Sequence, residues 1–274
     1  MFKIIIMALL IFIGMVGYDS ITDKAQPTTP VQQEQQKISK HEKSAAMALF
    51  TSLLPPKEEW PSPVHKFYLA FNMNEVIDPI CQNPNWTGLD AMSRDIPQAL
   101  IAIEDHAFYN HGAIAVEGIL RAALANINAG EVVQGGSTLT QQFVKNVFLS
   151  HEQSMERKIE EAVLSLMLED NYSKDEILEL YLNTTYFGAG STGIKQASRT
   201  YFGKAPSALT LAEAAVIASL PYAPTSLNPL ENPEGCKKRQ LLVLAAMHKY
   251  GMINQGQLAE AKAEKIRLTN GTVM

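Results

Sequence analysis

The most informative stretch of the chain reads Gly135-Gly136-Ser137-Thr138-Leu139-Thr140-Gln141-Gln142, followed by Phe143-Val144-Lys145-Asn146. Adjacent glycines adopt backbone angles that are closed to other residues, and they let a ligand approach the main chain. Thr138 and Gln141 have the spacing of a capping box, which predicts that a helix begins here. A helix N-terminus offers backbone N–H groups and the positive end of its dipole, and both favour a phosphate. The stretch is therefore either a phosphate-binding turn and helix or a capped surface helix after a flexible turn.

The polar residues of this predicted helix favour the first interpretation. Thr138, Gln141, Gln142 and Lys145 are spaced so that they project from about one face. A polar face that ends in a lysine beside a glycine turn suits a diphosphate better than a protein core. The stretch is not a nucleotide P-loop, because no Gly-Lys-Ser/Thr follows at the required distance.

Length and composition set only broad limits. The 274 residues are enough for one large domain or two small ones, and 46% of them are hydrophobic. The net charge of −5 gives no general indication of a nucleic-acid partner. Cys81 and Cys236 form neither a Cys-x-x-Cys site nor a disulfide framework, so two free thiols and one bridge both stay open.

The N-terminus predicts export across a membrane. Residues 4–18 are apolar and carry no charge after Lys3, a run near the short end of the roughly 17–25 residues that span a bilayer. A cleaved signal peptide would look similar, but no small-x-small cleavage site follows the run. We favour an uncleaved anchor over residues 1–18, then a polar linker over 19–60 and a folded domain over 61–270.

The rest of the chain is predicted to be mainly α, because few stretches alternate with a period of two. Start and stop signals predict helices over residues 95–104, 116–128, 138 onward, 152–171, 173–183, 210–220 and 232–251. The segment 64–90 fits neither helix nor strand clearly.

Two acidic segments are candidates for chemistry. Glu104 ends an apolar helix, and desolvation there would raise the pKa of its carboxyl group and suit it to proton transfer. The plain alternative is an ordinary helix-end acid in water. Arg157 and Glu161 are four residues apart, the spacing of a surface ion pair worth a few tenths of a kcal/mol. The turns after Glu161 are almost wholly apolar, however, so this charged pair is expected on a mostly buried helix, where it needs a partner or a ligand.

Five motifs occur in one order between about residues 90 and 250. They are Glu104-Asp105-His106-Ala107-Phe108-Tyr109-Asn110-His111, the Gly-Gly-Ser-Thr-Leu-Thr-Gln-Gln stretch, Arg157-Lys158-x-x-Glu161, Tyr181-Leu182-Asn183 with Tyr186 to Ile194, and Leu211-Ala212-Glu213-Ala214-Ala215 with Pro221, Pro224 and Asn228-Pro229. With these five motifs in this order, the chain resembles the peptidoglycan glycosyltransferases. This family comprises the transglycosylase domain of class A penicillin-binding proteins and the monofunctional biosynthetic transglycosylases.

The resemblance implies a mainly α, lysozyme-like glycosyltransferase domain with an N-terminal transmembrane helix. It implies a single-pass protein of the bacterial cytoplasmic (inner) membrane, with the catalytic domain on the outer, periplasmic face. The implied reaction polymerises lipid II into glycan strands, with inversion at the donor anomeric carbon and release of undecaprenyl diphosphate. The implied partners are lipid II, the growing glycan strand, the membrane and other cell-wall synthesis proteins, with no nucleic acid.

The resemblance also implies roles for individual residues. Glu104 matches the general base, and Glu161 matches a second essential glutamate that positions the donor diphosphate, directly or through a divalent cation (Mg or Mn) that it would ligate. The implied substrate-binding residues are Asp105, His111, Ser137, Thr138, Gln141, Gln142, Lys145, Arg157, Lys158 and Asn183.

The chain departs from the family at two positions of the first motif. Ala113 stands where glycine is usual, and Ala115 stands where aspartate is frequent, so the rim of the site or its activity could differ. No Ser-x-x-Lys or Lys-Thr-Gly occurs, so no transpeptidase function is expected. Two alternatives remain. One is a lysozyme-like enzyme that cleaves glycan with carboxylates, against which Lys145 and Arg157 argue. The other is an inactive cell-wall scaffold.

Overall fold

The computed structural model describes residues 68–69, 72–118, 136–149 and 154–274. The predicted anchor over 1–18 and linker over 19–60 lie outside these ranges, as do Gly135 and most of the predicted helix 116–128. Within the described ranges, no helix is both long and apolar enough to cross a membrane. The chain divides into two compact units, Met1–Glu75 and Val76–Met274.

In the first unit, the described residues form a short hydrogen-bonded segment. The side-chain amide of Asn72 donates to the carbonyl of Tyr68 at 3.0 Å, and the Tyr68 hydroxyl donates to the Glu75 carboxylate. Helix α4 (Asn74–Cys81) begins here, whereas the 3₁₀ helix η2 (Leu89–Ala91) belongs to the second unit. The segment that the sequence pattern left unassigned is therefore helical in part.

The second unit is built from helices whose ends follow the predicted caps. Capping boxes open three of them, pairing Thr138 with Gln141, Ser173 with Glu176 and Thr210 with Glu213. These three helices are α7 (Leu139–Phe148), α9 (Lys174–Thr184) and α11 (Leu211–Ser219). The predicted helices α5 (Asp95–Glu104), α8 (Met155–Asn171) and α12 (Pro233–Lys249) are also present. Helix α8 starts later than predicted, because Ser154 is its N-cap and accepts from the Arg157 amide.

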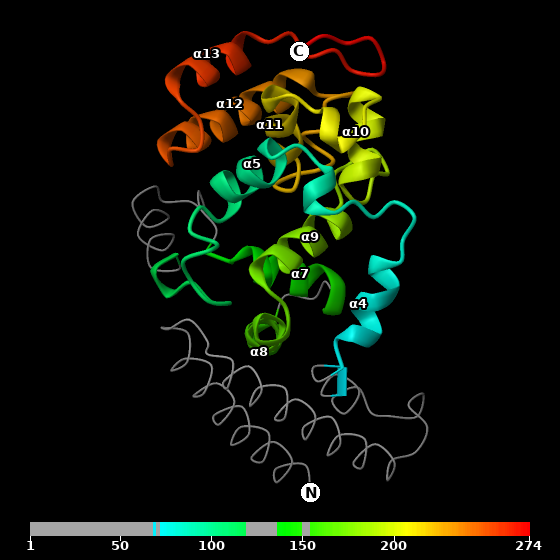
Figure 1. Cartoon of the computed structure of the whole chain (residues 1–274), viewed down its shortest axis with the longest axis vertical. Helices are drawn as coiled ribbons and strands as arrows, with labels where there is room; N and C mark the ends of the chain where they lie inside the picture. Colours follow the sequence, from blue (N-terminus) through cyan, green and yellow to red (C-terminus); the bar gives the residue numbers. More distant parts are fainter. Residues whose placement is uncertain (1–67, 70–71, 119–135, 150–153) are drawn as a thin grey trace, which may run out of the picture. The chain divides into compact units, whose positions relative to one another are not determined.

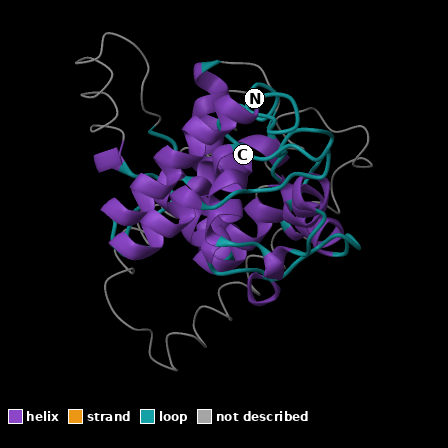
Figure 2. Ribbon diagram, turned by 90° about the horizontal axis from the view of Figure 1, so that it is seen from above, coloured by secondary structure: helices purple, strands orange, loops and turns teal. Residues whose placement is uncertain are grey.

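Three further elements were not predicted from the sequence. They are α10 (Ile194–Phe202), the 3₁₀ helix η3 (Pro206–Ala208) and α13 (Gln255–Ala263). Isolated β-bridges join Tyr186 to Thr192 and Arg267 to Val273, and Figure 2 shows no strand in the described part of the chain. The mainly α prediction is therefore confirmed for this part. Both cysteines are free thiols, Cys81 exposed and Cys236 buried.

The helices of the second unit pack in two groups. Helix α11 packs against α5 and α12, and α13 packs on α12 (Figure 1). Every residue of α11 from Ala212 to Ser219 is buried, as expected for the central helix of a bundle. The second group consists of α7 with α8 and α9, while α10 contacts both α9 and α11. The end of α5 and the start of α7 bring these groups together.

Two glycines in the turn after α9 leave no room for a side chain. Gly193 has a φ of +83°, and a Cβ atom there would lie 2.6 Å from the carbonyl oxygen of Asn183. Gly188 has a φ of +88°, and its Cβ would lie 2.3 Å from the carbonyl oxygen of Pro224. The glycines of the fourth motif thus allow close backbone approach, which fixes the end of α9 beside the start of α10.

Candidate active site

Glu104 is the last residue of α5 and lies where the two helix groups meet. Its Oε2 accepts a hydrogen bond of 2.9 Å from the side-chain amide of Gln142 on α7. Desolvation by burial raises the pKa of the Glu104 carboxyl, while the Gln142 bond and the charges of Arg239 and Lys145 oppose that rise. A carboxylate with a raised pKa that keeps a hydrogen-bond donor is suited to accept a proton.

Gln142 connects the candidate base to a third helix. Its Oε1 accepts a hydrogen bond of 3.0 Å from the hydroxyl of Tyr181 on α9, a side chain that is fully buried. The amide orientation is therefore determined, with the oxygen on Tyr181 and the nitrogen on Glu104. Side chains from α5, α7 and α9 thus form one hydrogen-bonded chain that ends at the Oε2 of Glu104.

Arg239 of α12 is a site residue that the sequence pattern did not identify. Its positive charge lowers the pKa of Glu104, ahead of the contribution of Lys145. Its guanidinium carbon lies 4.2 Å from the ring centroid of Tyr222, an exposed side chain, and its Nε is buried without a hydrogen-bond partner. A Lys-Lys-Arg run on a helix usually indicates a solvated face, so only the tertiary structure reveals this role.

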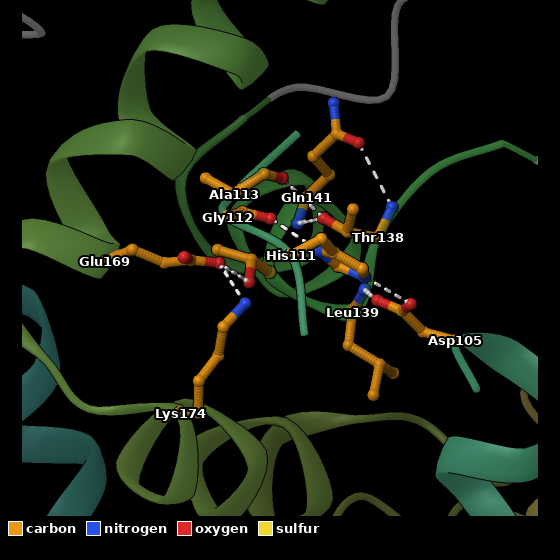
Figure 3. Close-up of polar contacts among 10 residues, drawn as sticks. Asp105, His111, Gly112, Ala113, Thr138, Leu139, Gln141, Glu169 and Lys174 are labelled. Carbon is orange, nitrogen blue, oxygen red and sulfur yellow. Dashed lines mark hydrogen bonds and ion pairs between the residues drawn. The ribbon is translucent and has the colours of Figure 1, made fainter. Parts of the chain in front are cut away.

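Asp105 and His111 form a network at the start of α7 (Figure 3). One oxygen of Asp105 lies 2.6 Å from the His111 Nε2, and the other accepts from the Leu139 amide at 3.1 Å. The His111 Nδ1 lies 2.6 Å from the carbonyl oxygen of Gly112. Both residues were predicted to bind substrate. In the structure their polar atoms make contacts within the protein, and their role in substrate binding stays a prediction.

The expectation that the start of α7 offers free amides to a phosphate does not hold for three of these amides. The Leu139 amide donates to Asp105, and the Gln141 amide donates to the hydroxyl of Thr138. The Thr138 amide in turn donates to the Gln141 side chain. Thr138 and Gln141 therefore serve as the helix cap, since each side chain accepts a hydrogen bond from the other residue's amide.

The first departure from the family pattern is structurally mild. Ala113 is buried, and its carbonyl oxygen accepts a hydrogen bond of 2.7 Å from the Thr138 hydroxyl. This bond uses only the main chain of residue 113, so an alanine preserves it. Ala115 is part of the same loop and is half-buried.

Glu161 on α8 is the centre of a cation cluster. Its side chain is buried, its Oε2 accepts from the Arg157 guanidinium at 3.1 Å, and its Oε1 pairs with the Lys158 ammonium. Lys158 also donates to the Ser137 hydroxyl at 3.1 Å, which links α8 to the segment before α7. The expected pairing of Arg157 with Glu161 is confirmed, and Lys158 adds a second cation to it. The helix is buried on one face only, because Glu161, Leu164 and Leu168 are buried while Met155 and Ile159 are exposed. The side chain of Lys158 keeps 45% of its surface exposed, so part of this charge faces solvent.

The donor set around Glu161 does not fit a divalent cation. Both of its oxygens are paired with protein cations, and the described ranges contain no group of three or more His, Cys, Asp or Glu residues that could hold a metal ion. A divalent cation needs several oxygen ligands.

Two predicted site residues lie apart from these clusters. Lys145 is exposed on α7, within electrostatic range of Glu104. Asn183 lies on α9, where its side-chain amide accepts from the Thr87 amide at 2.9 Å and donates to the carbonyls of Thr87 and Glu179. Asn183 thus joins the segment before α5 to α9. Its role in substrate binding stays a prediction.

A desolvated carboxylate and a cluster of cations on a helical scaffold define an enzyme site suited to transfer from an anionic leaving group. Residues 73–248 match the family model described as Transglycosylase. The chain belongs to this transglycosylase family.

Curated relatives agree with this assignment. Over 185 residues the chain is 44% identical to penicillin-binding protein 1A of Neisseria flavescens, an alignment that covers 68% of this chain and 23% of that protein. A protein of Cupriavidus necator named as a transglycosylase is 42% identical over 185 residues, with 68% of this chain and 80% of that protein covered. The chain thus matches only a part of the penicillin-binding protein and most of the Cupriavidus necator protein. A crystal structure of penicillin-binding protein 1A from Haemophilus influenzae is 33% identical, with a TM-score of 0.34 and coverage of 48% of this chain and 16% of that one. The family match and the curated relatives together show that the chain carries a peptidoglycan transglycosylase domain.

Proposed function

We propose that this protein polymerises lipid II into glycan strands and releases undecaprenyl diphosphate. The observation that carries the proposal is the desolvated Glu104, held by Gln142 near the charges of Arg239 and Lys145. A polymerising transferase needs a base for a sugar hydroxyl and cations for a departing diphosphate. The described residues provide candidates for both.

Glu104 acts as the general base. Its free carboxylate oxygen takes the proton of the acceptor 4-hydroxyl as that oxygen forms a bond to the donor anomeric carbon. The bond from this carbon to the diphosphate oxygen breaks at the same time, and the electron pair leaves with the diphosphate. Attack from the face opposite the leaving group inverts the anomeric carbon. Burial supports this role because it raises the pKa of the Glu104 carboxyl.

Arg157, Lys158 and Lys145 stabilise the charge that develops on the diphosphate. Preorganised cations act most strongly where charge appears in the transition state. Glu161 holds Arg157 and Lys158 on one face of α8 through its two oxygens. In this proposal Glu161 orients the cations, and its negative charge offsets part of their positive charge while the site is empty of substrate.

The lipid-linked donor places the reaction at a membrane. We propose a single-pass protein of the bacterial cytoplasmic membrane, anchored by residues 1–18, with its domain on the outer face. The apolar run at the N-terminus supports this location. The growing glycan strand and other cell-wall synthesis proteins are the proposed partners.

The test uses full-length protein in detergent with fluorescent lipid II, and it follows conversion to polymer. Glu104→Gln is compared with Glu260→Gln, which changes an exposed carboxylate on α13. We expect polymer from the wild type and Glu260→Gln, and none from Glu104→Gln. Polymer from Glu104→Gln would move the base elsewhere. Cleavage of purified cell wall without polymer from lipid II would favour a hydrolase, and binding of lipid II without either reaction would favour a scaffold.

A further inference from the structure

We propose that His111 is a positioning residue, a charged imidazolium that holds Asp105 against the start of α7 and thereby keeps Gln142 on Glu104. Neither Asp105 nor His111 touches substrate in this proposal. The inference rests on the proposed function insofar as Glu104 is the base, but the charge of the ring can be tested independently.

The geometry of the ring requires two hydrogens. The Nδ1 of His111 lies 2.6 Å from the Gly112 carbonyl oxygen, which can only accept. The Nε2 lies 2.6 Å from an oxygen of Asp105, whose other oxygen already accepts the Leu139 amide. An ionised carboxylate at a helix N-terminus is favoured by the dipole, so Asp105 also acts as an acceptor. A neutral imidazole has a single N–H and can satisfy only one of these contacts.

The charges around the ring are compatible with this state. The hydrogen bond to Asp105 is the main cause that raises the pKa of His111, while burial and Lys174 at the start of α9 lower it. Lys174 is paired with Glu169 of α8 at 2.7 Å, and Glu169 also accepts from the hydroxyl of Thr140. The neighbouring cation therefore has its own anion, and Asp105 remains available to the ring.

The network joins the ends of α5 and α7 at two successive residues. Asp105 accepts from the first amide of α7, and Glu104 accepts from Gln142 one turn further along that helix. In this proposal Asp105 keeps its contact with the Leu139 amide only while its other oxygen is hydrogen-bonded to His111. Loss of the ring proton removes one of the two ring contacts and the charge opposite Asp105, so α7 loses a restraint on the residue that positions the base.

The expected pH dependence follows from the direction of the pKa. Because the folded protein raises the pKa of His111, the imidazolium persists to higher pH than in a free histidine and is lost as pH rises through that pKa. Polymerisation by the wild type should therefore decline on the alkaline side. Asp105→Asn replaces the anion by a neutral amide and should move this decline to lower pH.

The experiment combines a pH profile with nitrogen NMR of full-length protein in detergent, labelled at histidine. We expect both nitrogens of His111 to be protonated at neutral pH, with the signal assigned by its absence in His111→Gln. We expect His111→Gln to lower kcat roughly ten- to hundredfold, the usual consequence of a small misplacement, with a smaller change in KM for lipid II. A matched control is His248→Gln. The ring of His248, on α12, lies 3.1 Å from the carbonyl oxygen of Ile253, and the pH profile of this variant should follow that of the wild type.

Two results would overturn the inference. One is a neutral His111 ring in the folded wild type at neutral pH. The other is an alkaline decline that stays in place in Asp105→Asn while thermal unfolding shows that the variant is folded. A wild type that makes no polymer would instead refute the proposed function, and the NMR signal would still decide the charge of the ring.

Discussion

Replacing Gln142 by methionine tests whether the hydrogen bond from Gln142 lowers the pKa of the candidate base Glu104. The side-chain amide donates to the Glu104 Oε2 at 2.9 Å, and methionine keeps a similar volume without a donor. A hydrogen bond to a charged group contributes about 1.5–3 kcal/mol, and this bond favours the ionised form. Its loss raises the pKa of Glu104, so the acidic limb of kcat/KM moves to higher pH. At pH values below the pKa of Glu104, the rate of the variant should be roughly ten- to hundredfold lower than that of the wild type, since about 1.4 kcal/mol corresponds to a factor of ten.

The matched control for this prediction is Tyr181→Phe. It removes the hydroxyl that donates to the Gln142 Oε1 but leaves the donor to Glu104 in place. We expect a loss of stability on the order of 1 kcal/mol, with the acidic limb unchanged. The assay is polymer formation from fluorescent lipid II at subsaturating concentration across pH 4–8, together with thermal unfolding. A folded Gln142→Met enzyme whose acidic limb coincides with that of the wild type would refute the reasoning.

Three further predictions concern electrostatics, backbone and metal. Arg239→Gln removes a charge that lowers the pKa of Glu104, so its acidic limb should also move to higher pH; a move to lower pH would contradict the assignment. Gly193→Ala should destabilise by more than about 1 kcal/mol, and its Tm should fall by at least about 2–4 °C, because the new Cβ meets the Asn183 carbonyl at 2.6 Å with φ at +83°. Gly190→Ala, at φ +71° with no atom within 4 Å of the new Cβ, should lose less stability. An equal loss would mean that backbone strain, and not the clash with the carbonyl, causes the destabilisation. Polymer formation should persist in excess EDTA; a rate restored only by added Mg²⁺ or Mn²⁺ would show that a metal is required.

Helix starts could be predicted from the sequence where both halves of the cap are local. A capping box needs only two residues three apart, so Thr138 with Gln141 was sufficient to predict α7. Helix α13 carries the same signal in Asn254 and Gln257 and could have been found in the same way. Helix α10 could not, because its N-cap is Gly193 and no side chain caps it.

The candidate site was predictable in its carboxylates but not in its connections. Apolar neighbours around Glu104 and Glu161 indicated desolvation, since burial of a helix is visible in its own sequence. Two of the site's connections depend on helices that are distant along the chain. The Leu139 amide donates a hydrogen bond to Asp105, and the charge of Arg239 lowers the pKa of Glu104. No local pattern distinguishes a carboxylate that meets substrate from one that holds a neighbouring helix.

The carboxylate of Asp105 at the start of α7 has a consequence for product release. Backbone amides are fixed in direction, and a diphosphate bound by them would have to leave a rigid site. Here the first amide of α7 is already engaged by the protein's own anion. The leaving group is left to long side chains such as Lys158, which is partly exposed and can rotate away with it. Under the proposed function the spent lipid carrier has to leave after each transfer, and a movable side chain would both attract the diphosphate during bond cleavage and allow it to depart.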